Sequence, residues 1–180
     1  MSDTGAKYAG SVSEGDGSNS WTNLNNVLAN DSAYASNWED TDVPTITLVK
    51  LIKGGSQSGD NKASGNSLPT SVGNVNFGGA SDLWGNTLSD SDINASNFGI
   101  AVQLKWNIYG TMKTFLLTNY GFSVPSGATI NGIAAAVRCY KASSRISTYI
   151  YVDCVGLTVY YTEGGGTAFT QTRMMTGWGA

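Results

Sequence analysis

Apolar and polar residues alternate along the most regular segments of this chain, and that two-residue period restricts its fold more than any other feature. In Phe98–Trp106 every second residue is apolar, and Ala128–Lys141 and Ile146–Thr162 are longer stretches of the same kind. Successive side chains of a β-strand point to opposite faces, so this alternation is typical of strands with one buried face. Thr45–Lys53 has apolar residues on both faces, which indicates a strand that is partly covered on its second side. The pattern predicts an all-β protein.

The polar residues are short ones that suit turns and the exposed faces of strands. Charged residues make up only 13% of the 180 residues, and the sequence contains three glutamates. Helix surfaces are normally built from Glu, Lys, Gln and Arg, so we do not expect a mostly helical fold. Hydrophobic residues at 41% are enough for a sizeable core. Strands separated by glycine-rich turns then predict a β-sandwich with a jelly-roll-like architecture.

Two glycines interrupt the longest strands. Asn131-Gly132 follows Ile130 and precedes apolar residues of the opposite parity, which predicts either a tight hairpin or a β-bulge. The bulge is favoured, because the residues before it are too few for an independent strand. A second change of parity across Gly156 predicts another bulge at that glycine.

Three regions of the chain differ in pattern. Residues 45–162 hold the regular segments and are predicted to form the sandwich domain. Residues 1–44 carry isolated large apolar residues among turn formers, which indicates an extended N-terminal arm with aromatic anchors or short edge strands. A short helix over Trp21–Leu28 is a further alternative. Residues 163–180 begin with a glycine run and are predicted to form a flexible, hinged C-terminal tail.

Residues 54–97 are rich in Gly, Ser, Asn and Asp and are too long for a plain connection between strands. We therefore expect this segment to be an ordered excursion, that is, a long loop region with a functional role. Within it, Ser89–Ser96 predicts a hydroxyl N-cap and the acidic first turn of a very short helix. Asp90–Asn94 also opens like a calcium-binding loop. That match fails, because Ala95 stands where the loop needs Gly and Ala101 where it needs Glu.

The chain offers few groups for catalysis. It has no histidine and only two cysteines, Cys139 and Cys154, which removes the commonest general base and excludes zinc clusters and disulfide frameworks. Most acidic residues lie in turns, where capping and solvation explain them better than sugar hydrolysis does. We therefore expect a protein that is not an enzyme and needs no cofactor or metal. The two cysteines fit buried free thiols, or a disulfide that forms after release.

Large aromatic residues are the candidate groups for binding a glycan or a partner. Trp84 lies among glycines, and Tyr149 and Tyr151 lie on one face of a strand, where their rings could stack on sugars. The alternative is that these residues fill the core or a subunit contact.

A second set of apolar residues indicates contacts between chains. Met174, Met175 and Trp178 follow the glycine run and have no obvious place in their own domain. They are therefore predicted to dock on a neighbouring chain, and Trp21 in the N-terminal arm is predicted to do the same.

The charge and the ends of the chain restrict its partners and location. The net charge of −3 argues against nucleic acid or an anionic membrane as the main partner. No apolar run approaches the roughly 20 residues of a membrane span. The N-terminus is polar and acidic and does not look like a secretory signal, so we expect synthesis in the cytosol.

Several segments carry a resemblance to known proteins. They are Gly5–Gly10, Trp21, Leu48–Gly55 with Gly59–Ala63, Phe77–Gly85 with Asp92–Gly99, and Tyr120–Ile133. In this order they resemble a family of uncharacterised proteins encoded by tailed bacteriophages and prophages. The resemblance implies a virion structural protein, assembled in the host cytoplasm, that contacts further copies of itself and other virion proteins. Capsid decoration and a tail or fibre role both fit. Asn23-Leu24 departs from the family, in which an Asn-Pro is expected after the Trp.

A carbohydrate-binding adhesin module is the alternative function. The turn Pro125–Ile130 has the form Pro-x-Gly-Ala-x-Ile, which secreted carbohydrate-associated β-sandwiches also use. In that case Trp84, Tyr149 and Tyr151 would recognise glycans on the host surface.

Overall fold

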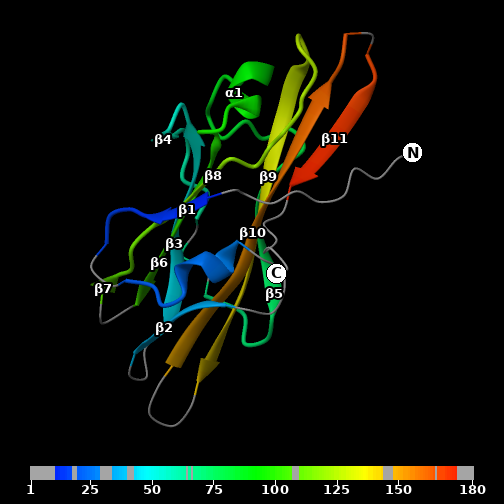
Figure 1. Ribbon diagram of the computed structural model, residues 1–180. Coiled ribbons are helices and arrows are strands. Elements are labelled where there is room, and N and C mark those ends of the chain that lie inside the picture. The colour runs from blue at the N-terminus through cyan, green and yellow to red at the C-terminus, as the bar shows by residue number, and fades with distance from the viewer. Residues whose placement is uncertain are drawn as a thin grey trace, which may run out of the picture.

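Two antiparallel β-sheets lie against each other and enclose one hydrophobic core, as Figure 1 shows. The computed structural model describes residues 11–17, 20–28, 34–39, 43–63, 65, 67–106, 110–143, 148–164 and 166–173. Over these residues one short α-helix and one 3-10 turn accompany the strands. The predicted all-β sandwich is confirmed.

The first sheet has six strands in the order β1-β8-β6-β3-β4, with β7 paired to β6 outside this row. Its strands are β1 (Ser11–Glu14), β3 (Pro44–Lys53), β4 (Ser56–Ser58), β6 (Gly99–Trp106), β7 (Gly110–Thr111) and β8 (Phe115–Thr118).

The second sheet has five strands in the order β11-β10-β9-β5, with β2 paired to β10. Its strands are β2 (Ala35–Glu39), β5 (Gly73–Gly79), β9 (Thr129–Ser143), β10 (Thr148–Thr162) and β11 (Ala168–Arg173).

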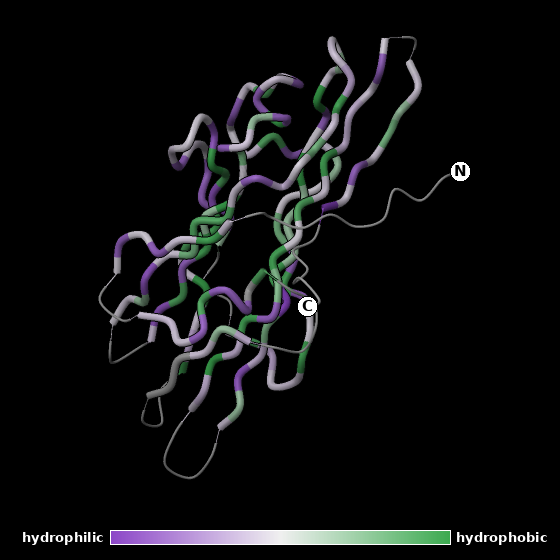
Figure 2. The backbone as a smooth tube through the Cα atoms, viewed as in Figure 1, coloured by the Kyte–Doolittle hydropathy of each residue, from purple (hydrophilic) through white to green (hydrophobic). Residues whose placement is uncertain are grey.

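The core is filled from alternate positions of facing strands. Every second residue of β6 from Ile100 to Trp106 is fully buried, and the inward positions of β9 from Ile133 to Cys139 are at most 2% exposed. Figure 2 shows hydrophobic segments along the strands in the middle of the molecule and hydrophilic stretches in many of the loops. The alternation in the sequence therefore reports burial directly for these two strands.

Strand β10 has both edges paired because two segments from distant parts of the chain share its second edge. Leu157–Thr162 pairs with β11, whereas Thr148–Val152 pairs with β2. Between them, Leu28 forms an isolated bridge to Cys154. The backbone groups of β10 are thus paired on this side along most of its length, which leaves little open edge for other chains to add to.

The bulge predicted in β9 is confirmed. Tyr160 pairs with Gly132 but the next residue, Tyr161, pairs with Ile130, so Asn131 is the extra residue. Its side-chain amide donates to Thr162 Oγ1 at 2.7 Å. Strand β9 is therefore continuous through Asn131-Gly132 and contains no hairpin there.

The second predicted bulge lies at a different residue. The register of β10 against β9 shifts between Val152 and Cys154, which makes Asp153 the extra residue. The prediction of a bulge at Gly156 is wrong, because the alternation has already changed at the buried Val155.

The prediction that residues 1–44 form an arm outside the sandwich is wrong for the part of this region that the structure describes. Strand β1 pairs with β8, and β2 pairs with β10. Residues 24–27 form a single 3-10 turn, η1 (Leu24–Val27), and no α-helix. The alternative of short edge strands is the one that the structure has, because these segments satisfy backbone groups that each sheet would otherwise leave open.

The C-terminal boundary is also wrong. Strand β11 continues the second sheet beyond residue 162, and Glu163 N donates to Thr167 O at 3.2 Å across the connection. Gly164 and Gly166 therefore lie in a hairpin connection between β10 and β11 and not in a hinge. Three of the residues predicted to dock on a neighbouring chain, Met174, Met175 and Trp178, lie outside the described residues.

Residues 54–97 form the ordered excursion that their composition predicts, and they also supply strands. The predicted short helix is α1 (Asp90–Asn94), in which the Ser89 hydroxyl accepts from Asp92 N and the Asp92 carboxylate accepts from Ser89 N. Strand β5 of the second sheet lies in the same excursion, and the sequence did not indicate it.

Candidate functional site

Trp84 is a core residue and does not contact solvent. Its side chain is fully buried, and its Nε1 donates to Ile133 O at 2.8 Å. A Cβ on Gly78 would lie 2.6 Å from that Nε1, so the glycine makes room for the indole. The prediction that Trp84 binds a glycan is wrong, because the neighbouring glycines allow close packing around the ring and do not expose it.

The loops around Trp84 are joined by a dense set of polar contacts. Asp60 N donates to Trp84 O at 2.7 Å, and Trp84 N donates to Asp82 Oδ1 at 2.8 Å. Lys62 forms ion pairs with Asp82 at 3.0 Å and with Asp60 at 3.3 Å. The pKa of Lys62 is raised, chiefly by its hydrogen bond with Asp82. These acidic groups hold two loops together, and no cluster of three or more potential metal ligands occurs among the described residues.

Trp21 is buried against its own chain. Its ring lies 4.3 Å from the ring of Phe115, and its Nε1 donates to Lys113 O at 2.8 Å. Its backbone N donates to Glu14 Oε1 at 2.8 Å. The prediction that Trp21 docks on a neighbouring chain is wrong, because packing on β8 removes its ring from the surface.

Four tyrosines form a cluster on the outer face of the second sheet. Tyr149 is 37% exposed, and its ring lies 6.2 Å from that of Tyr151. Tyr151 stacks at 4.7 Å on Tyr140, and Tyr34 meets both of them edge-on. We call these four residues the tyrosine cluster. The structure thus brings two predicted residues together with two that the sequence did not single out.

A shallow groove lies on the same outer face, toward β5 and β11. Its volume is about 360 Å³, and small residues of adjacent strands line it, among them Ala134, Ala136 and Gly156. Tyr160 also lines this groove. Aromatic and small residues therefore follow one another along the exposed side of the β9–β10 pair.

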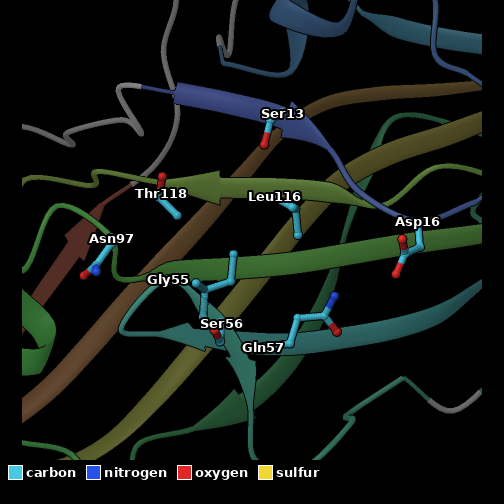
Figure 3. Close-up of a pocket in the computed structure, with 9 residues that line it drawn as sticks. Ser13, Asp16, Gly55, Ser56, Gln57, Asn97, Leu116 and Thr118 are labelled. Carbon is cyan, nitrogen blue, oxygen red and sulfur yellow. The ribbon is translucent and has the colours of Figure 1, made fainter.

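The first sheet carries a larger hollow on its outer face, which we call the sheet pocket (Figure 3). Its volume is about 650 Å³. Thr118 of β8, Gly99 of β6 and Ile52 of β3 lie side by side across the sheet. Because the middle residue of these three is a glycine, no side chain fills the space between Thr118 and Ile52. Polar side chains surround the hollow: Ser13, Asp16, Ser56, Gln57, Asn97 and Thr118. None of these residues was predicted as a binding residue.

The two cysteines are buried free thiols, as the first alternative predicted. Burial raises the pKa of the Cys139 thiol to about 12, and the nearby Cys154 adds to this shift. Burial likewise raises the pKa of Cys154 to about 12. At neutral pH neither thiol is a nucleophile.

Arg173, at the end of β11, is a buried cation. It is 4% exposed, and its guanidinium carbon lies 6.0 Å from the centre of the Phe122 ring. Within the described part of the chain its Nε and Nη1 have no hydrogen-bond partner. Burial lowers the pKa of this group, because the charged form is poorly solvated.

Comparisons with known proteins give no relative. No protein-family model matches the chain, and neither a curated protein nor a solved structure is significantly similar to it. Among the described residues no helix is long and apolar enough to cross a membrane.

Proposed function

We propose that this chain is a non-enzymatic structural component of a bacteriophage virion, assembled in the host cytoplasm, in capsid decoration or in the tail or fibre apparatus. It acts by contacts with further copies of itself and with other virion proteins. The observation that carries the proposal is that the segments of sequence resemblance, which are far apart in the chain, meet in one structural unit.

Hydrogen bonds join these segments in pairs. Asp60 N donates to Trp84 O at 2.7 Å, which links the first set of segments to the second. Trp84 Nε1 donates to Ile133 O at 2.8 Å, which links the second set to the third. Asn94 and Val124 make a reciprocal pair of bonds, each of 2.8 Å, between the same two sets. The three sets of segments that resemble the family are therefore in contact with one another in the structure, which supports a shared fold with that family.

The proposal is tested on purified particles. Virions of the phage or induced prophage that encodes the chain are purified on a density gradient and analysed by mass spectrometry. We expect the chain in the particle band, and antibody labelling in the electron microscope then assigns it to capsid or tail. An abundant host cytosolic protein serves as the control for contamination. Presence in the lysate and absence from washed particles would contradict the proposal.

The tyrosine cluster favours a second function, a carbohydrate-binding adhesin module. Tyr149 and Tyr151 present stacked rings on the same outer face of the second sheet as a groove of small residues, and sugar rings bind aromatic faces through their C–H groups. The test is calorimetric titration with host surface polysaccharide. Tyr149→Ala is expected to weaken binding at least tenfold. Phe169→Ala is the matched control, since Phe169 is a similarly exposed aromatic of the same sheet, at 39%. Equal effects of the two changes would contradict a site at the cluster.

A further inference from the structure

We propose that the sheet pocket binds an uncharged saccharide, one or two sugar residues in length. This inference goes beyond the virion proposal and does not depend on it. It concerns the outer face of the first sheet, whereas the tyrosine cluster lies on the second.

Five polar side chains from separate segments converge on the pocket without being used by the fold. Ser13 comes from β1, Asp16 from the turn after it, Ser56 and Gln57 from β4, and Asn97 from the connection before β6. In the described part of the chain none of these five side chains forms a hydrogen bond. Figure 3 shows Asp16 and Gln57 directed from opposite sides toward the same space.

Polar side chains in the neighbouring loops behave differently. Asn61 accepts from Val49 N at 2.8 Å, Asn86 donates to Trp84 O at 3.0 Å, and Asn94 donates to Val124 O at 2.8 Å. Those asparagines have a structural role, because they satisfy backbone groups of their loops. The amides of Gln57 and Asn97 have no such role, which leaves their donors and acceptors available to a ligand.

The backbone beneath these side chains is held in place. Asp16 O accepts from Thr114 N at 3.0 Å and from Gln103 Nε2 at 3.0 Å. Asn97 O accepts from Gly55 N at 3.2 Å, and β4 pairs with β3. The main chain therefore fixes the points from which these exposed side chains reach the pocket, so a ligand has only the side chains left to order.

The lining matches a sugar ring in its apolar part as well. Leu116 is half-buried and, with the small accessible part of Ile52, which is 3% exposed, gives the pocket an aliphatic surface on which the C–H face of a ring can rest. Amides and hydroxyls around them can bond to the hydroxyl groups of the ring in both directions. The volume of about 650 Å³ falls within the range of about 300–1,000 Å³ that is typical of small-molecule sites.

The charge of the pocket selects among sugars. Asp16 is the ionisable residue of its lining, and no Lys or Arg contributes to the described lining. A carboxylate accepts hydrogen bonds from sugar hydroxyls but repels an anionic ligand. The pocket therefore fits neutral saccharides and not uronic or sialic acids.

The experiment uses the full chain and a defined set of probes. Glucose, galactose, N-acetylglucosamine, cellobiose and lactose are titrated into isotope-labelled protein, with glucuronic and N-acetylneuraminic acids as charged comparators, and amide shifts are recorded by NMR. We expect saturable shifts at residues 13–16, 56–57 and 97 with at least one neutral saccharide. No binding of any neutral probe, or tighter binding of the acids, overturns the proposal.

Variants locate the site. Gln57→Ala and Asn97→Ala are each expected to weaken binding at least tenfold without lowering the melting temperature, because neither side chain bonds to the described protein. Asn25→Ala, an exposed asparagine of η1 that lines neither hollow, is the matched control and leaves the affinity unchanged. Tyr149→Ala also leaves it unchanged, which separates this pocket from the tyrosine cluster. Binding that is lost in Tyr149→Ala and kept in Gln57→Ala and Asn97→Ala overturns the proposal.

Discussion

The indole Nε1 of Trp84 lies 2.8 Å from the carbonyl oxygen of Ile133, and this bond ties the loop after β5 to the middle of β9. Replacing Trp84 with Phe removes the donor and leaves a buried carbonyl without its partner. We expect the free energy of unfolding to fall by about 2–3 kcal/mol, from the unsatisfied acceptor and the smaller ring. Denaturation in urea measures the change, with Tyr160→Phe on the outer face of the second sheet as control. Equal stability of the Trp84→Phe and Tyr160→Phe proteins would show that the bond contributes nothing.

Gly78 and Gly79 are adjacent residues of β5 with opposite tolerance for a side chain. Gly78 has φ +67°, and a Cβ there would lie 2.3 Å from Ile133 O, whereas a Cβ on Gly79 meets nothing within 4 Å. We expect Gly78→Ala to destabilise the protein by at least about 2 kcal/mol through backbone strain and the clash. Gly79→Ala should change stability by no more than about 0.5 kcal/mol. Melting curves of the two variants compare them, and a larger loss for Gly79→Ala would contradict the packing around Trp84.

Glu14 makes the attachment of β1 depend on pH. The pKa of its carboxyl is lowered, chiefly because it accepts the backbone N–H of Trp21; burial opposes this and Lys113 adds to it. The folded state thus favours the charged form. Its contribution is present above the ordinary glutamate pKa of about 4.3 and is lost as the pH falls through the lower folded value. The stability difference between the natural chain and Glu14→Gln should shrink below about pH 4. Denaturation across a pH series measures it, and a constant difference would refute the assignment.

Cys139 and Cys154 should be unreactive in the folded protein. With pKa values raised to about 12 by burial, only about one thiol in ten thousand is ionised at pH 8. We expect no reaction with Ellman's reagent under native conditions and two thiols per chain in guanidinium. If no thiol reacts after denaturation without reductant, the cysteines are joined in a disulfide.

Arg173 should reduce the stability of the fold, because it is buried at 4% exposure and two of its nitrogens have no hydrogen-bond partner among the described residues. Arg173→Met keeps a long side chain beside Phe122 and removes the charge. We expect the free energy of unfolding to rise by about 1–2 kcal/mol. Arg173→Lys retains a cation and should not stabilise the protein. A loss of stability in the Met variant would mean that the guanidinium has a compensating partner.

The sequence predicts the long strands well because each one carries its own evidence. Alternation alone locates β6, β9 and β10, and the parity change at Asn131 predicts a bulge that the structure contains. Strands β5 and β11 were not predicted as sheet members, and β1 and β2 were predicted only as the alternative of short edge strands. They are short and built largely of Ser, Asn, Gly and Thr, so the partner strand decides their conformation more than their own residues do.

Candidate binding residues were harder to predict, because exposure is a property of the whole fold. Glycines beside Trp84 were taken to expose it, yet they allow other atoms to approach its ring. Tyr149 was correctly placed at the surface, whereas Tyr34 joins the cluster from a part of the chain with no regular pattern. No sequence pattern predicted the sheet pocket. Its polar side chains come from separate turns and strands, and none of these segments carries a binding motif of its own.

Strands β2 and β11 share one edge of β10, and this arrangement affects how the chain folds during its synthesis. Strand β1 also pairs with a strand that is distant in the sequence, because Ser11 of β1 lies opposite Thr118 of β8, 107 positions later. Such distant pairings form slowly, because a long stretch of chain must be ordered before they can close. A nascent chain will carry its first strands unpaired until β8 and then β10 have left the ribosome. Fragments that stop before β10 will therefore aggregate, whereas chains that extend through β11 can fold.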